Sequence, residues 1–309
     1  MLDTHCNVQK SLLRLSKLLI AISFITFTLS AEKAPGPVLL QNLGACLNPL
    51  GMLLDTRVLY RIPLSQDTGI LFRSAKFEGG FINEWSPGDE LFGVGLNIEP
   101  IAIFNMELKA GLYENYSAFG FGYQRIAGKN GPYHDTVLAD IPQENHAGTR
   151  LTLAPSLKLK AGPVIVADNF TCNRIDFFST DGYFYEIRTA LPHATHDVDV
   201  INDLLLLYEW NKRWLTGFNY NLVYVRGTEI RQQKLGGMII FNTPHKRFTN
   251  LFGLITGGMY LESELRYHTP YIAALCGFEV PVLCGKRRNT TVRRSDVLPA
   301  RSDLAVSYR

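Results

Sequence analysis

Two short segments place titratable residues close enough in the sequence to suggest chemistry. In the first, His193, His196 and Asp197 lie within five residues of one another. Imidazole rings together with a carboxylate are ligands that zinc prefers. Short histidine patterns often occur without a metal, and this one falls between two predicted strands. We therefore interpret the segment as a solvated loop and predict no metal site.

Glu186 and Arg188 form the second segment. Residues two apart in a strand point to the same face of a sheet, so an ion pair between these side chains is expected. Such a pair either fills the interior of a narrow barrel or selects solutes by charge. The sequence favours the first of these interpretations, because side chains fill the interiors of small barrels.

A catalytic arrangement is not evident. An acyl hydrolase needs a serine nucleophile with a histidine base, and neither a Gly-x-Ser-x-Gly motif nor a Ser-Asn pair beside a histidine occurs. The cysteines show no Cys-x-x-Cys spacing, which argues against a zinc or thioredoxin-type site. The sequence thus predicts no catalytic, metal or cofactor site, and whether the chain is an enzyme stays open, with a non-enzyme favoured.

Composition limits the class of protein. The 309 residues are 46% hydrophobic but only 19% charged, and aromatic residues and glycine are plentiful. A formal net charge of +3 gives no global basic field, so nucleic acid is not an expected partner. At the N-terminus, Lys10, Arg14 and Lys17 precede an apolar run that ends at Leu29-Ser30-Ala31. This layout predicts a secretory signal peptide over residues 1–31.

The rest of the chain alternates with a period of two, as strands with one apolar face do. Residues 149–161 show it most clearly, because leucines alternate there with polar residues. The leucines are Leu151, Leu153, Leu157 and Leu159, and the polar residues include Thr152, Ser156, Lys158 and Lys160. Glu107 and Lys109 take the polar positions of a similar run. The pattern predicts an all-β, antiparallel barrel of about 12 strands, within a range of 10 to 14.

The strands and the turn signals between them predict a domain order. After the signal peptide we expect an N-terminal periplasmic segment over residues 32–52 and a β-barrel over residues 53–278. Residues 279–309 contain a dense set of arginines and little that is apolar, so we expect a disordered basic tail. The predicted strands include residues 119–125 and 183–191, and residues 79–90 are expected as a loop. Most of the predicted strands are long enough for a tilted strand to cross a bilayer.

These features resemble the class of bacterial outer-membrane β-barrels. The last predicted strand alternates through Ile272, Ala274 and Cys276 and ends on Phe278, which is similar to the C-terminal aromatic strand that barrel-assembly machinery recognises. The resemblance implies a transmembrane barrel in the outer membrane of a Gram-negative-type bacterium, with the bilayer and that machinery as partners. It also implies that charged strand residues line the lumen; the candidates are Glu107, Lys109, Lys158, Lys160, Glu186 and Arg188.

Three functional hypotheses follow. The first is a non-enzymatic barrel, either a small porin or a structural barrel. The second is a lipid-modifying barrel enzyme of the outer membrane. The third is a soluble periplasmic binding barrel like a lipocalin, because a period of two does not distinguish an apolar interior from an apolar exterior.

Overall fold

The computed structural model describes residues 35–282, apart from short gaps at 66–68, 70, 73, 117–122, 130, 132, 134, 180, 244–247 and 249–250. The predicted signal peptide and residues 283–309 of the predicted tail lie outside the described residues. Within the described residues, no helix is long and apolar enough to cross a membrane.

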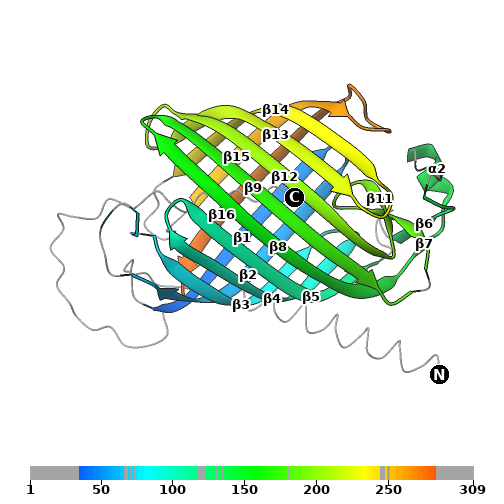
Figure 1. The fold of residues 1–309 in the computed structure, drawn as a ribbon, viewed down its shortest axis with the longest axis horizontal. Coiled ribbons are helices and arrows are strands. Elements are labelled where there is room, and N and C mark those ends of the chain that lie inside the picture. Colours follow the sequence, from blue (N-terminus) through cyan, green and yellow to red (C-terminus); the bar gives the residue numbers. More distant parts are fainter. Residues whose placement is uncertain are drawn as a thin grey trace.

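Twelve described strands form a closed antiparallel barrel, which confirms the predicted fold class (Figure 1). Its strands are β1 (Gly36–Leu47), β2 (Gly51–Pro63), β3 (Lys76–Trp85), β4 (Asp89–Ile101), β5 (Phe104–Asn115), β8 (His146–Ala161), β9 (Val164–Phe177), β12 (His196–Glu209), β13 (Trp214–Val225), β14 (Ile230–Thr243), β15 (Leu251–Glu262) and β16 (Pro270–Pro281). Pairing of β1 with β16, from Val38 opposite Pro281 to Leu47 opposite Ile272, closes the barrel. Closure leaves no edge of the barrel sheet unpaired.

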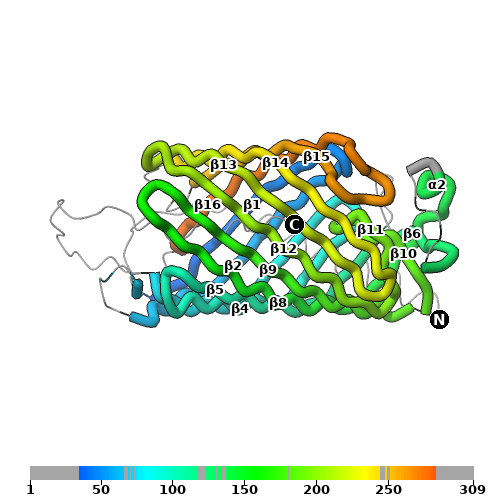
Figure 2. Tube along the Cα trace, turned by 45° about the horizontal axis from the view of Figure 1, so that its top comes forward, coloured from blue at the N-terminus to red at the C-terminus, as the bar shows by residue number. Residues whose placement is uncertain are grey.

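Two long connections, between β5 and β8 and between β9 and β12, build a second sheet that we call the cap. Its strands are β6 (Tyr123–Ile126), β7 (Gln143–Glu144), β10 (Tyr183–Glu186) and β11 (Leu191–Ala194), and it includes the short helix α2 (Asp135–Asp140). The cap lies at one end of the barrel, which we call the capped end (Figure 2). Both ends of the barrel sheet, at Gly36 and Pro281, lie at the opposite, open end.

The alternation sorts side chains between the two faces of the wall. In β8, Leu153 is 40% exposed on the outside, whereas the neighbouring Thr152 is fully buried inside. Phe81 of β3 and Phe218 of β13 also face outward and are among the most exposed apolar side chains. The outer surface of the barrel is therefore apolar, and the polar positions of the strands face inward.

The inner face is divided. On the side of β9 and β12–β15, inward residues near the open end form an apolar cluster of Ile165, Ala167, Leu205, Leu207, Leu215, Met238, Ile240 and Leu254. Where the cap meets the wall, aromatic rings of Tyr123 and Phe184 from the cap pack with those of Tyr113 and Phe177 from the wall. The inner face of β2–β5 carries charged residues instead.

The predicted boundaries need correction at both ends of the barrel. Residues 32–52 do not form a separate periplasmic segment, because β1 spans 36–47 and β2 starts at 51. The predicted end at residue 278 is also wrong, since β16 continues to Pro281. The start of β1 was hidden because the neighbouring Val38 and Leu39 are both buried, so the alternation fails there.

The predicted number of strands is correct, but some of the segments predicted as wall strands are not the ones observed. Residues 79–90, expected as a loop, form most of β3 and the turn to β4. Gly80 serves close packing within β3, because a Cβ there would lie 2.1 Å from the carbonyl oxygen of Val58. Conversely, the expected strands over residues 119–125 and 183–191 do not cross the barrel wall; their described parts lie in the cap.

Candidate functional site in the barrel interior

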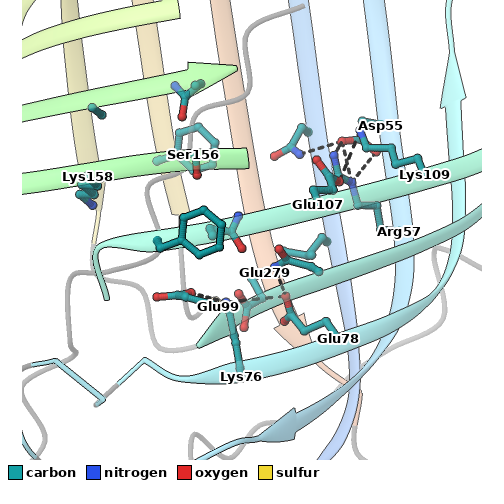
Figure 3. Close-up of a pocket in the computed structure, with 18 of the residues that line it drawn as sticks. Asp55, Arg57, Lys76, Glu78, Glu99, Glu107, Lys109, Ser156, Lys158 and Glu279 are labelled. Carbon is teal, nitrogen blue, oxygen red and sulfur yellow. Dashed lines mark hydrogen bonds and ion pairs between the residues drawn. The ribbon is translucent and has the colours of Figure 1, made fainter. Parts of the chain in front are cut away.

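Charged side chains from neighbouring strands gather on the inner face of β2–β5 and line a cavity of about 200 Å³. Figure 3 shows this cavity with side chains that belong to several strands. Its lining reaches from Ile103, in the β4–β5 turn at the open end, to Glu84 and Lys109 deeper in the barrel. The lining from the other strands mixes apolar residues, such as Ala167, Phe252 and Leu275, with polar ones, such as Asn169 and Lys158. The charged residues of the cavity are thus concentrated on β2–β5.

Arg61 forms the centre of an ion-pair network in the outer part of the cavity. Its guanidinium lies 2.5 Å from Glu78 of β3 and 2.5 Å from Glu279 of β16, so it joins two strands on either side of β1 and β2. Lys76 adds weaker contacts, at 3.7 Å to Glu78 and 3.8 Å to Glu99. Two cations thus lie between three carboxylates, which leaves this part of the lumen slightly acidic.

The inner part of the cavity holds a second network. Arg57 pairs with Asp55 at 2.8 Å and with Glu107. Lys109, which is only 2% exposed, lies 3.4 Å from Glu107 and 2.6 Å from Glu84. Buried charges need such partners, because an unpaired ion in a low-dielectric interior is strongly destabilising.

Arg188 connects this network to the cap. It follows β10 in the chain and reaches the wall, where its guanidinium pairs with Glu84 and lies 2.5 Å from Asp89. It also lies over the ring of Tyr113, 5.3 Å from the centroid. All three charged side chains are at least nine-tenths buried. Arg188 is therefore a latch between the cap and the barrel wall.

The structure places the six predicted lumen residues in three different settings. Glu107, Lys109 and Lys158 line the cavity. Lys160 lies at the rim of the open end, where its half-exposed ammonium pairs with Glu209 of β12. Glu186 and Arg188 were expected side by side on one wall strand, which is wrong.

Glu186 ends β10 of the cap, and Arg188 lies in the turn that follows it. Glu186 is fully buried and accepts hydrogen bonds from the hydroxyl of Tyr113 and from the backbone N–H of Thr189, the latter at 2.7 Å. Both residues therefore tie the cap to the wall rather than line an open constriction.

His193 also differs from the expectation of a solvated loop. Its side chain is fully buried in β11, with Nδ1 3.1 Å from the carbonyl oxygen of Leu191 and Nε2 3.4 Å from Asp199 of β12. His196 is half-exposed and lies 3.3 Å from Asp176, so the two histidines do not converge. Among the described residues, no group of three His, Cys, Asp or Glu side chains has the arrangement of a metal site.

Burial by itself lowers the pKa of His193, but the contact with Asp199 and the carboxylates of Glu186 and Asp197 raise it above the ordinary histidine value. A raised pKa in the folded state stabilises the fold below the pKa of the unfolded chain, about 6.5, and this contribution disappears as pH rises through the folded pKa. The charged imidazole therefore strengthens the attachment of the cap in mildly acidic solution.

We predict that His193→Gln lowers the thermal unfolding midpoint most at about pH 6, below the ordinary histidine pKa. The difference from the wild type should shrink as pH rises past the folded pKa, because the wild type then loses the same ion pair. The measurement is the unfolding midpoint of both proteins in detergent micelles across this pH range. A difference that stays constant with pH would contradict the role given to the imidazolium.

Several important lumen residues were not predicted from the sequence. Asp55, Arg57 and Arg61 occupy inward positions of β2, while Val58 and Tyr60 face outward. The same kind of alternation identified Lys158, so the pattern in β2 could have predicted that these three residues face the lumen. Glu78 and Glu84 were missed because β3 was taken for a loop.

Comparisons with known proteins give only an architectural likeness. No family model matches the chain, and no curated protein matches it. A NanC porin structure is 9% identical, covers 79% of this chain and 100% of its own, and has a TM-score of 0.37. The CymD monoaromatic hydrocarbon channel is 7% identical, with coverages of 81% and 89% and a TM-score of 0.38.

An outer-membrane expressed OmpT of Vibrio cholerae is 7% identical, with coverages of 82% and 99% and a TM-score of 0.35. By name, these proteins are a porin, a hydrocarbon channel and an outer-membrane protein. Identity this low does not carry a solute or an activity over to this chain.

Proposed function

We propose that this chain is a non-enzymatic β-barrel of an outer membrane: a small porin whose passage is closed by its own cap. The observation that carries the proposal is the distribution of side chains, with exposed apolar residues around the outside and ion pairs inside. A barrel with this distribution satisfies its backbone hydrogen bonds between strands and presents an apolar band to lipid.

The lipocalin-like alternative requires the reverse distribution. A soluble binding barrel places its polar face in water and its apolar face around a ligand. Here Leu151, Leu153, Leu157 and Leu159 face outward along one strand, and the cavity has a charged wall. In water such an exterior is an exposed apolar surface far larger than soluble monomers tolerate.

The enzyme alternative lacks a supporting arrangement in the described residues. Their histidine rings contact carboxylates, a backbone carbonyl oxygen or aromatic rings, and none bonds a serine hydroxyl. A structural barrel is the second candidate, because the cap closes one end. The polar networks favour a porin: they extend from the cavity near the open end to Arg188, beside the aromatic rings that pack where the cap meets the wall.

The connections suggest an orientation. At the open end the turns 102–103, 162–163 and 210–213 are short and the longest connection spans 64–75, whereas the two longest connections of the barrel, 116–145 and 178–195, lie at the other end. Bacterial outer-membrane barrels have short periplasmic turns and longer extracellular loops. We therefore assign the open end to the periplasm and the cap to the cell surface.

Membrane fractionation combined with gel mobility tests this proposal. The protein should stay in the outer-membrane fraction after alkaline extraction, and its mobility should change when the sample is boiled, because a closed barrel resists detergent at room temperature. In planar bilayers the wild type should show little conductance. A protein recovered in the soluble periplasmic fraction would refute the proposal.

A further inference from the structure

An outward-facing polar pair interrupts the apolar exterior of the barrel. The carboxylate of Asp168, in β9, accepts a hydrogen bond of 2.6 Å from the side-chain amide of Asn202, in β12. Both residues lie at even positions of their strands, like the exposed Phe170 and Leu204 that flank them. The pair therefore points away from the lumen.

Apolar side chains surround this pair. Leu157 and Leu204 lie directly opposite Asp168 on the two neighbouring strands. The exposed neighbours on the same face are Leu157, Val166, Phe170, Leu204 and Leu206, which are between 38% and 52% exposed. Ion pairs at the strand ends, such as Lys160 with Glu209 and Arg174 with Asp176, lie beyond this belt. A carboxylate thus sits within the part of the wall that faces hydrocarbon.

Hydrocarbon cannot hydrogen-bond the remaining polar atoms of the pair, so exposing them to lipid is unfavourable. Within the pair, Asn202 Nδ2 donates a hydrogen bond to Asp168 Oδ1. An amide has two N–H donors and an acceptor oxygen, and a carboxylate accepts at both oxygens. The pair therefore retains both a donor and acceptors that face outward, which makes its surface complementary to itself.

We propose that this outer face of β9 and β12 is a contact between two copies of the chain, in which the Asn202 amide of each copy donates to the Asp168 carboxylate of the other. The proposal rests on the membrane insertion proposed above. A symmetric contact uses the same patch on both subunits, as this pair allows. Hydrogen bonds between polar side chains in an apolar surround are also a known means of association within membranes.

The first test is the mass of the protein in mild detergent, measured by native mass spectrometry on the full chain. The wild type should be a dimer, and Asp168→Leu/Asn202→Leu should be a monomer. Thr56→Leu is the matched control, since Thr56 is an outward position of β2, on a distant part of the wall, and this variant should stay dimeric. A monomeric wild type, a dimeric double variant, or a complex with a different polypeptide would overturn the proposal.

The heat-modifiable mobility of all three proteins separates this proposal from the previous one. If the wild type is a monomer and its gel mobility still changes on boiling, the dimer is refuted and the membrane barrel is not. If the mobility of the wild type does not change on boiling, both proposals are refuted.

Two native cysteines test where the copies meet. Cys172 lies on the outer face of β9, two residues beyond Phe170, and Cys276 is exposed on β16, five strands away in the barrel order. In membranes, a short bis-maleimide should cross-link a variant that keeps only Cys172 several-fold more than one that keeps only Cys276. Equal yields, or a higher yield through Cys276, would contradict the proposed face.

Discussion

Arg188→Ala should convert a barrel with little conductance into one that conducts ions in a planar bilayer. The substitution leaves two buried carboxylates, Glu84 and Asp89, without their shared cation. Removing one member of a buried ion pair destabilises that arrangement by about 3–5 kcal/mol. Glu84 keeps Lys109 and Asp89 keeps a hydrogen bond from Ser86, so we expect the lower part of that range. The cap should then leave the capped end for a substantial fraction of the time.

A matched control is Arg231→Ala. Arg231 pairs with Glu262 at 2.8 Å, also near the capped end, but both side chains are exposed. Exposed pairs contribute little, so this variant should conduct no better than the wild type. If Arg188→Ala assembles normally and stays closed, the latch does not hold the cap, and the structural barrel becomes the better account of the protein.

Leu153→Arg should prevent assembly of the barrel. Leu153 faces outward near the middle of β8, where an arginine on the lipid side costs about 2–4 kcal/mol. The loss is comparable to a large share of the stability of an ordinary domain. The readout is the fraction of protein with heat-modifiable mobility after expression or refolding.

Ser156→Arg provides the comparison for this experiment. Ser156 lies three residues along the same strand, but it lines the wet cavity beside the charged wall. An arginine there remains hydrated and close to carboxylates, so assembly should be nearly normal. Equal failure of both variants would show that β8 tolerates no large cation on either face, and the lipid-facing assignment of the leucines would lose its support.

The sequence predicted the facing of side chains correctly where apolar and polar residues alternate within a single strand. In β8 the leucines and polar residues alternate on both sides of Ala154-Pro155, and the structure places them on opposite faces as predicted. The same regularity supported the strand count, because most wall strands repeat it. The all-β class and the approximate number of strands could therefore be predicted from local periodicity and turn signals.

Periodicity does not decide which strands belong to the wall. Residues 183–191 look like a spanning strand, but Phe184 and Tyr185 bury their rings in two different interior clusters, and the chain turns back after Glu186. Likewise, His193 lies in a stretch that reads as a polar loop, and its burial depends on Asp199 of a different sheet. Such assignments depend on tertiary contacts that local patterns do not encode.

The partners of the ion pairs could not be predicted from the sequence either. Arg61 and Glu279 are 218 residues apart and meet only because β1 and β16 close the barrel. Alternation within a strand predicts that each of these residues faces the lumen, whereas its ion-pair partner is determined by how the strands close into a barrel. Sequence reasoning thus identified part of the lumen lining and missed how the lining is connected to the cap.

A scan of single spin labels along β8 in reconstituted membranes tests whether the outer face of this barrel contacts lipid. Labels at residues 151, 153, 157 and 159 should be accessible to oxygen, which concentrates in hydrocarbon, and protected from a water-soluble relaxation agent. Labels at 154, 156 and 158 should show the opposite preference, because these positions face the interior. Equal access of the water-soluble agent to both sets would contradict the account, since the leucine face would then lie in water.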